Sequence, residues 1–180
     1  MNLLEPDYPA PSKPFMPRMV TDITQRVIHH SAGPITQTPL EIDAFERQRA
    51  DHFIYIPYCY VIGPTGSDYT KPVLYRGRPY MVVEGATFGE HLQSLSVCVL
   101  GNFERGDAGY TGPPTQELKD LLVQWGVYTQ TICPAISRTI GHKDTALEQG
   151  YDDQCPGSDL IVFLPELRQR IAQAFNHRGG

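Results

Sequence analysis

Apolar residues recur every three or four positions in three segments of the chain, the spacing of helices with one buried face. Residues 113–132 show the pattern most clearly, and the apolar side there comprises Leu118, Leu121, Leu122, Trp125 and Tyr128. A second helix is predicted for residues 164–175, with Pro165 near its start. We expect its inward face to carry Leu167, Ile171, Ala174 and Phe175.

The third helical segment, residues 38–51, opens with a start signal. Thr38 fits the N-cap position, Pro39 the first helical position and Glu41 the third, which together make a capping box. Helical spacing places the least polar positions on one side of this segment and the charged residues on the other. The expected inward positions are Leu40, Ala44, Phe45 and Gln48.

Five further segments are rich in β-branched and aromatic residues and end in turn-forming residues, as strands do. They are residues 25–34, 55–66, 72–79, 94–103 and 137–144. The run 94–103 is continuously apolar, which is typical of a strand buried on both faces in the middle of a sheet. Residues 72–79 are expected to pair with 55–66 across a long turn. Residues 77–93 contain several glycines and are expected to form a loop that lines a cleft.

The order of these elements predicts the fold class. Strand, helix, several strands, helix, strand and helix follow one another, which indicates an α/β fold with a mixed central sheet flanked by helices. A chain of 180 residues fits one domain of roughly 100–200 residues. Residues 1–22 contain five prolines and are expected to form an extended arm. The domain would then cover 23–176, and 177–180 would be a flexible tail.

Charge and hydropathy narrow the classes of function. The formal net charge of −5 argues against nucleic acid as a partner, because phosphate binding favours a basic face. No apolar run approaches the roughly 18 residues of a membrane span. The first 19 residues do not have the basic start and apolar stretch of a signal peptide, so we expect no export signal.

Metal-binding side chains stand at two places where strands are expected to end. His29 ends the strand in 25–34, His142 ends the strand in 137–144, and Cys155 follows in a polar loop before Pro156. Catalytic zinc commonly has three such ligands and one open position. His30 would point to the other side of its strand. From the residues alone, a single histidine is more often a surface or core residue than a metal ligand.

Several of these segments, taken in order, resemble one known family. "VIHHSAG", "IPYCYVIGPTG", "YRGRP", "SLSVCVLGNF" and "IGHKD…CPGSDL" follow the order seen in zinc-dependent N-acetylmuramoyl-L-alanine amidases of type 2. This family includes short phage lysins and the peptidoglycan recognition proteins. The resemblance covers residues 25–165. It implies the mixed sheet already expected and one catalytic Zn²⁺ as cofactor.

The resemblance also assigns roles to individual residues. It implies that His29, His142 and Cys155 hold the zinc. Tyr58 corresponds to the catalytic tyrosine of the family, although a strand aromatic packed in the core explains that residue equally well when it is taken alone. His91 corresponds to a cleft histidine that contacts substrate or supports a ligand.

Three further positions each have two expected roles. Asp153 stands where the family has Lys or Thr beside the reacting carbonyl, so it is expected to point outward or to orient a ligand. Lys143 is a substitute for that cation, or simply solvated. Arg78 is expected to reach carboxylates of the peptide stem, or to lie on a solvated turn. The interval between His142 and Cys155 is also longer than usual, through an apparent insertion of "LEQGYDD".

The resemblance implies hydrolysis of the amide between N-acetylmuramic acid and the L-alanine of the peptidoglycan stem. A phage-type bacteriolytic endolysin is the expected form: a monomer made in the host cytoplasm that reaches the wall through the opened inner membrane. Two alternatives stay open. One is a module that binds peptidoglycan without cutting it, and the other is a cytosolic amidase that recycles cell-wall fragments.

Overall fold

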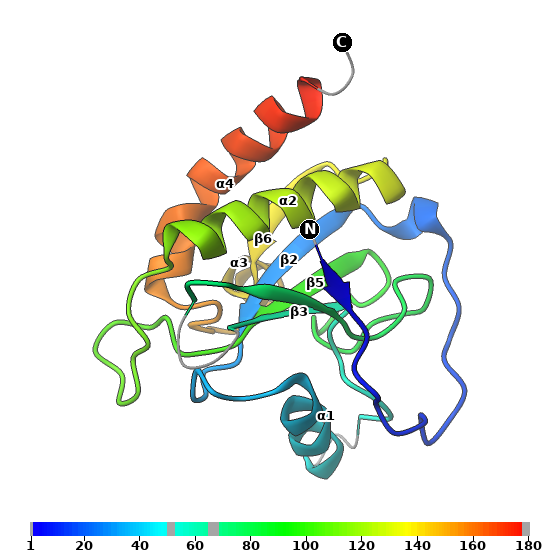
Figure 1. Ribbon diagram of the computed structural model, residues 1–180. Helices are drawn as coiled ribbons and strands as arrows, with labels where there is room; N and C mark the ends of the chain where they lie inside the picture. Colours follow the sequence, from blue (N-terminus) through cyan, green and yellow to red (C-terminus); the bar gives the residue numbers. More distant parts are fainter. Residues whose placement is uncertain (1, 50–52, 65–68, 178–180) are drawn as a thin grey trace.

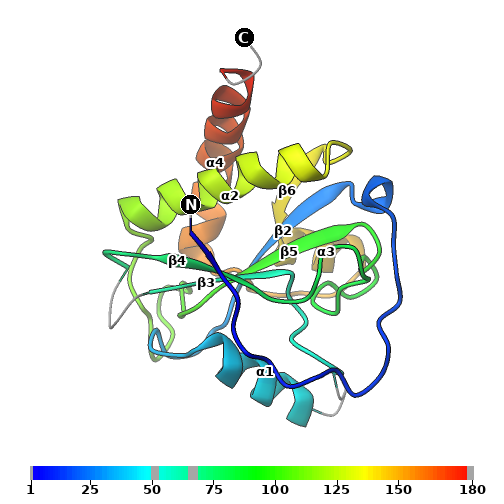
Figure 2. The ribbon, with the colours of Figure 1, turned by 45° about the vertical axis from the view of Figure 1, so that its right-hand side comes forward.

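The computed structural model describes residues 2–49, 53–64 and 69–177, and these form one mixed sheet with helices on both faces (Figures 1 and 2). The strand order is β1-β4-β3-β5-β2-β6. The strands are β1 (Leu3–Leu4), β2 (Gln25–His30), β3 (Tyr60–Gly63), β4 (Val73–Arg76), β5 (Ser94–Val99) and β6 (Arg138–Gly141). β3 and β4 are antiparallel, whereas the other pairs are parallel. The predicted α/β fold is confirmed.

The helices make two unequal layers. On one face of the sheet lie α2 (Gln116–Ile132) and α4 (Ser158–Asn176), which pack against each other, and α1 (Pro39–Gln48) covers the opposite face (Figure 2). The short α3 (His142–Glu148) follows β6, and a single 3₁₀ turn, η1 (Val20–Asp22), precedes β2. Within the described residues, no helix combines the length and the apolar character needed to cross a membrane.

The larger part of the core lies between the sheet and the α2–α4 layer. The expected apolar face of α2 is buried there, with Leu118, Leu122 and Trp125 fully inaccessible. β5 lies in the middle of the sheet and is buried along its whole length, as its continuous apolar run predicts. The two helices approach closely at Gly126, where an added Cβ would lie 2.2 Å from Cδ1 of Ile171.

The capping box of α1 is confirmed, but its predicted inward face is wrong. Leu40 and Phe45 are 43% and 58% exposed, and the helix instead buries Ile42, Asp43 and Glu46. Two acidic residues can lie inward because each has a basic partner one turn away along the chain.

The N-terminal arm covers the polar side of α1. The guanidinium of Arg47 pairs with Asp43 at 2.7 Å and donates to the carbonyls of Pro9 and Ala10 in the arm. The charged side of α1, which the sequence pattern places toward solvent, is therefore paired and covered. Helical periodicity alone does not predict this.

α4 begins six residues earlier than predicted. Its first residue is Ser158, so Pro165 lies inside the helix and not near its start. The carboxylate of Glu104 accepts from the amide N–H of Ser158 at 2.7 Å, and so satisfies one of the N–H groups that a helix start leaves free. Leu167 and Ile171 face inward as predicted, but Phe175 is 40% exposed and does not.

Arg18 fixes the end of the arm inside the protein. Its side chain is 5% exposed and donates to the carbonyls of Tyr80, His91, Leu92 and Ser94. β1, which the sequence pattern does not reveal, pairs with β4 at the sheet edge. The division of the chain at residue 22 stays a prediction, and residues 178–180 of the expected tail lie outside the described residues.

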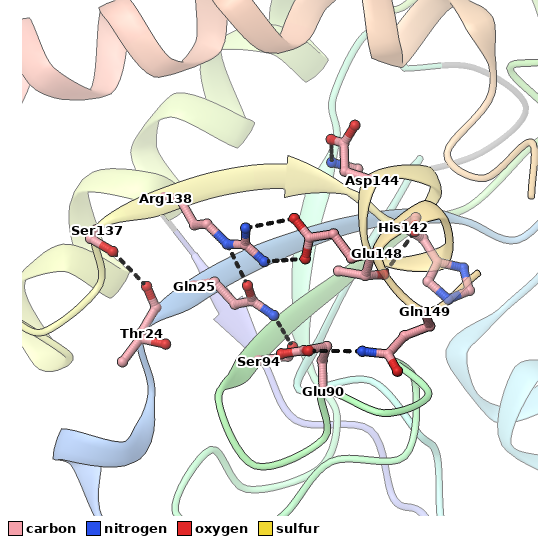
Figure 3. Close-up of polar contacts among 12 residues, drawn as sticks. Thr24, Gln25, Glu90, Ser94, Ser137, Arg138, His142, Asp144, Glu148 and Gln149 are labelled. Atoms are coloured by element: carbon pink, nitrogen blue, oxygen red, sulfur yellow. Dashed lines mark hydrogen bonds and ion pairs between the residues drawn. The ribbon is translucent and has the colours of Figure 1, made fainter. Parts of the chain in front are cut away.

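A polar network fixes the place of α3 against the sheet (Figure 3). Arg138 of β6 donates to Gln25 of β2 at 2.7 Å and makes two 2.8 Å contacts with Glu148 at the end of α3. Gln25 in turn donates to the hydroxyl of Ser94 on β5. The neighbouring Gln149 donates to Glu90 in the cleft loop. Because the C-terminal end of α3 is held in this way, its first residue, His142, has a defined position.

Candidate metal centre

His29 is the second-last residue of β2, and His142 directly follows β6. Because β2 and β6 are parallel neighbours, both histidines lie at the same edge of the sheet. Ile28 of β2 is in register with Gly141 of β6, and the residue that follows each of them in the sequence is a histidine. Carboxyl ends of parallel strands meet at one edge, which is where α/β sheets commonly bind ligands. The two rings lie with their centroids 4.5 Å apart.

Cys155 completes the group from the loop that joins α3 to α4. Its sulfur lies 3.7 Å from Nδ1 of His29 and accepts from the backbone N–H of His30 at 3.4 Å. One donor atom from each of His29, His142 and Cys155 lies within 4.8 Å of the other two. Two imidazoles and a thiolate are the donor set that zinc prefers, so the residues fit this ion.

Asp153 supports two members of the cluster. One carboxylate oxygen accepts from the amide N–H of Cys155 at 2.7 Å, and the other lies 3.3 Å from Nδ1 of His142. The same loop is also fixed to the first turn of α3, because the amide of Lys143 donates to the carbonyl of Cys155 at 2.7 Å. Of the two expected placements of Asp153, the structure shows the one against a ligand.

His30 lies outside the cluster although it is adjacent to His29. Its Nδ1 accepts from the backbone N–H of Phe103 at 3.2 Å, and its side chain is 8% exposed. Strand alternation accounts for this difference, because consecutive side chains point to opposite faces of the sheet.

Tyr58 lies beside the cluster, just before β3. Its ring meets the ring of His29 edge to face with centroids 5.2 Å apart. Burial, together with neighbouring groups that include Cys98, raises the pKa of Tyr58 well above its ordinary value. The phenol therefore keeps its proton at neutral pH and can act as a hydrogen-bond donor.

The cluster lines a cleft of about 890 Å³. Tyr58 and His91 also line it, and Nδ1 of His91 is buried without a hydrogen-bond partner among the described residues. Two phenylalanines on its rim are largely exposed, Phe45 at 58% and Phe88 at 68%. An open cleft with a few polar groups and an apolar rim is typical of a binding site for an extended ligand.

A second cavity, of about 430 Å³, lies between β6 and α4. Its charged lining is basic, with Arg26, Arg138 and Arg168. In the part of the chain that the structure describes, His29, His142 and Cys155 are the only group of three or more metal-capable side chains whose donor atoms meet, and they lie in the larger cleft. We therefore take the larger cleft as the candidate functional site.

Arg78 and Lys143 do not lie where substrate binding would need them. Arg78 is 6% exposed, and its guanidinium donates to the carbonyls of Tyr55, Ile56 and Val83. It fixes two loops to each other, and the expectation of a solvated turn is wrong. The ammonium of Lys143 lies 3.8 Å from Asp152, and neither Arg78 nor Lys143 is among the described residues that line the cleft.

Two residues at the site have no counterpart in the sequence predictions. Tyr151 lines the cleft with its hydroxyl 3.3 Å from Nε2 of His142. Thr87 lies behind His29, with its hydroxyl 3.4 Å from Nε2 of that ring. The insertion "LEQGYDD" was the available signal for Tyr151, because that segment lies between His142 and Cys155 in the sequence.

Burial governs the electrostatics of the three donors. It lowers the pKa of His29, helped by the charge of His142, and it lowers the pKa of His142. It also raises the pKa of the Cys155 thiol. Neutral imidazoles are ready to bind a metal, whereas the thiol must lose its proton when a cation arrives.

Comparison with known proteins places the chain in a family. It is 30% identical over 171 residues to a peptidoglycan-recognition protein of Drosophila melanogaster, a match that covers 87% of this chain and 80% of the relative. The chain belongs to the family of type-2 amidases and peptidoglycan recognition proteins. No family model matches the chain.

Two solved structures of amidase-family proteins share the fold. The N-acetylmuramoyl-L-alanine amidase LysC from Clostridium intestinale has a TM-score of 0.75 at 22% identity, covering 96% of this chain and 98% of its own. The Ph2119 endolysin of a Thermus scotoductus bacteriophage has a TM-score of 0.70 at 19% identity, covering 94% and 99%. These similarities extend over nearly the whole of each chain, so the fold is shared.

Proposed function

We propose that this protein is a zinc-dependent peptidoglycan amidase that hydrolyses the bond between N-acetylmuramic acid and the L-alanine of the stem peptide. The observation that carries the proposal is the group of His29, His142 and Cys155 at the base of an open cleft. Membership of the amidase and recognition-protein family supports the substrate class. The non-catalytic members of such a family need a cleft but have no use for three converging metal donors.

His29, His142 and Cys155 would hold the zinc. When bound, zinc supplies Lewis-acid polarisation of a carbonyl and lowers the pKa of water to about 7. Asp153 keeps Cys155 and His142 in place through its two oxygens. His29 is 2% exposed, and its burial strengthens the charge interactions that this donor makes.

Tyr58 is the catalytic residue that we assign outside the metal donors. Its hydroxyl keeps a proton, and its ring is fixed against His29. It can donate to the oxygen of the substrate carbonyl as negative charge develops there. His91 lines the same cleft, and we assign it to substrate contact on that ground.

We further propose that the protein acts as a phage-type endolysin and works as a monomer. The similarity to LysC and to the Ph2119 endolysin supports this role. A protein of this kind is made in the host cytoplasm and reaches the wall when the inner membrane is opened. A cytosolic enzyme that recycles wall fragments is the competing role, and it would prefer soluble muropeptides to intact sacculi.

Binding without hydrolysis is the second candidate function. Asp153, an acidic residue where a cation or hydroxyl would assist the reaction, is the observation that favours it. A solved relative of recognition-protein type, the PGRP-LCa and PGRP-LCx complex, is described as bound to tracheal cytotoxin.

Analysis of the cleaved bond separates these candidates. Purified sacculi and soluble muropeptides are incubated with the protein, and new amino termini and new reducing sugars are measured. An amidase produces L-alanine amino termini without reducing sugars, and an endolysin does so faster on sacculi. Retention of the protein on sacculi with no new amino termini would instead support the binding module.

A further inference from the structure

A buried carboxylate lies behind the metal centre. Glu84, in the cleft loop between β4 and β5, is 3% exposed. One of its oxygens accepts from the backbone N–H of Ser96 at 2.9 Å, and the other accepts from the hydroxyl of Thr87 at 2.6 Å. Arg18 and Arg78 are cations close enough to act on this carboxylate. A buried carboxylate is costly unless hydrogen bonds and nearby cations compensate for the water that it has lost.

Thr87 connects this carboxylate to His29. Its side chain is fully buried, and its hydroxyl oxygen lies 3.4 Å from Nε2 of His29. A hydroxyl has one hydrogen to donate. The shorter contact, to the carboxylate of Glu84, is the charge-assisted one and receives that hydrogen. The Thr87 oxygen is then left as an acceptor toward His29.

We propose that Glu84, acting through Thr87, fixes His29 in the tautomer with its proton on Nε2 and its lone pair on Nδ1. Nδ1 is the nitrogen that faces Cys155, at 3.7 Å from its sulfur. A neutral imidazole binds a metal through the nitrogen without a proton, and a partner on the other nitrogen decides which one that is. Glu84 and Thr87 are therefore positioning residues for the zinc site, and the inference rests on the proposed function in naming the ion.

The variant Glu84→Gln tests the proposal, because the backbone N–H of Ser96 fixes the orientation of the new amide. In Glu84→Gln, the fixed N–H of Ser96 requires the amide oxygen on its side, so the amide NH₂ is turned toward Thr87. The hydroxyl of Thr87 then accepts from the amide, and its own hydrogen is free to donate to Nε2 of His29. A change that keeps shape and volume thus reverses the direction of both hydrogen bonds and favours the proton on Nδ1.

The first readout needs no metal. Ring ¹⁵N spectra of histidine-labelled, metal-free protein distinguish protonated from unprotonated nitrogens, and the signals of His29 are assigned by their loss in His29→Asn. Wild type and Thr87→Ser are expected to carry the proton on Nε2. Glu84→Gln is expected to carry it on Nδ1, and Thr87→Val to show a mixture of the two tautomers.

The second readout is zinc affinity, measured by competition with a chromophoric chelator. Loss of a group that orients a metal ligand weakens binding about 10- to 100-fold. We expect this loss in Glu84→Gln and Thr87→Val. Thr87→Ser keeps the hydroxyl and should bind zinc as tightly as the wild type. Thr129→Val, a change of the same kind at a fully buried threonine on α2, controls for removal of a hydroxyl and should leave both readouts unchanged.

The outcomes separate this inference from the proposed function. A wild-type His29 with its proton on Nδ1 overturns the inference, and so does a Glu84→Gln spectrum identical to wild type. If the tautomer changes as described but the wild-type protein binds no zinc, the positioning of His29 by Glu84 and Thr87 stands and the proposed function fails. Because the spectra are recorded on folded protein, unfolding of a variant is seen directly and is not mistaken for a change of tautomer.

Discussion

Arg18 is expected to be one of the most important residues for stability, although it belongs to a proline-rich arm. Replacing it with methionine keeps most of the apolar stem but removes the guanidinium. Four carbonyl groups, those of Tyr80, His91, Leu92 and Ser94, then lose a donor, and buried Glu84 keeps Arg78 but loses Arg18 as a nearby cation.

The structure allows an estimate of the cost. The Ser94 contact is fully buried, and an unsatisfied buried carbonyl costs about 1–3 kcal/mol. The three other contacts are only part-buried, so water can replace the donor at about 0.5–1 kcal/mol each. We therefore expect Arg18→Met to lower the free energy of unfolding by about 2.5–6 kcal/mol, which is a large part of the roughly 5–15 kcal/mol of a typical domain.

Urea unfolding of the metal-free protein measures this effect. Trp125 is the single tryptophan and is fully buried, so its fluorescence reports loss of the core. The midpoint should fall while the slope with urea stays the same. Lys13→Met, at an exposed position of the same arm, is the matched control and should change stability by less than about 0.5 kcal/mol. An Arg18→Met protein within about 1 kcal/mol of wild type would refute the reasoning.

Three further predictions concern the site and its surroundings. Tyr58→Phe should reduce turnover on peptidoglycan by about 100- to 1000-fold while zinc content stays normal, and unchanged turnover would show that the hydroxyl has no catalytic part. In the metal-free protein, burial lowers the pKa of His29 and His142, so the unfolded chain binds more protons below about pH 6.5 and stability is lost as the pH falls further. Each histidine should contribute about 1.4 kcal/mol per pH unit there, and a flat profile between about pH 7 and 5 in urea titrations would contradict the assignment. Arg78→Met should lower stability by about 2–4 kcal/mol without changing zinc affinity, and a selective loss of substrate binding in this variant would restore a role in the cleft.

The elements with strong local patterns were predictable from the sequence. The apolar run of β5, the spacing of α2 and the capping box of α1 each depend on residues close together in the chain, and the structure confirms all three. His29 and His142 could be placed at strand ends for the same reason. Their meeting required only that β2 and β6 be parallel neighbours.

Other features depend on contacts between distant segments and leave no local pattern. The buried side of α1 is decided by the arm, whose carbonyls accept from Arg47. The early start of α4 depends on Glu104, which lies 54 residues before Ser158. Arg18, Glu84 and Thr87 look like ordinary surface or loop residues in the sequence, and only the packing of the cleft loop against β5 buries them.

Zinc dependence of amide hydrolysis is the most direct test of the metal centre. Release of L-alanine amino termini from purified peptidoglycan is measured for protein as isolated, after chelation and after addition of one equivalent of zinc, with Cys155→Ala treated in the same way. We predict one tightly bound zinc, loss of activity on chelation, recovery on addition, and no recovery in Cys155→Ala. Full activity in the chelated protein, or zinc bound equally well by Cys155→Ala, would contradict a zinc centre at these residues.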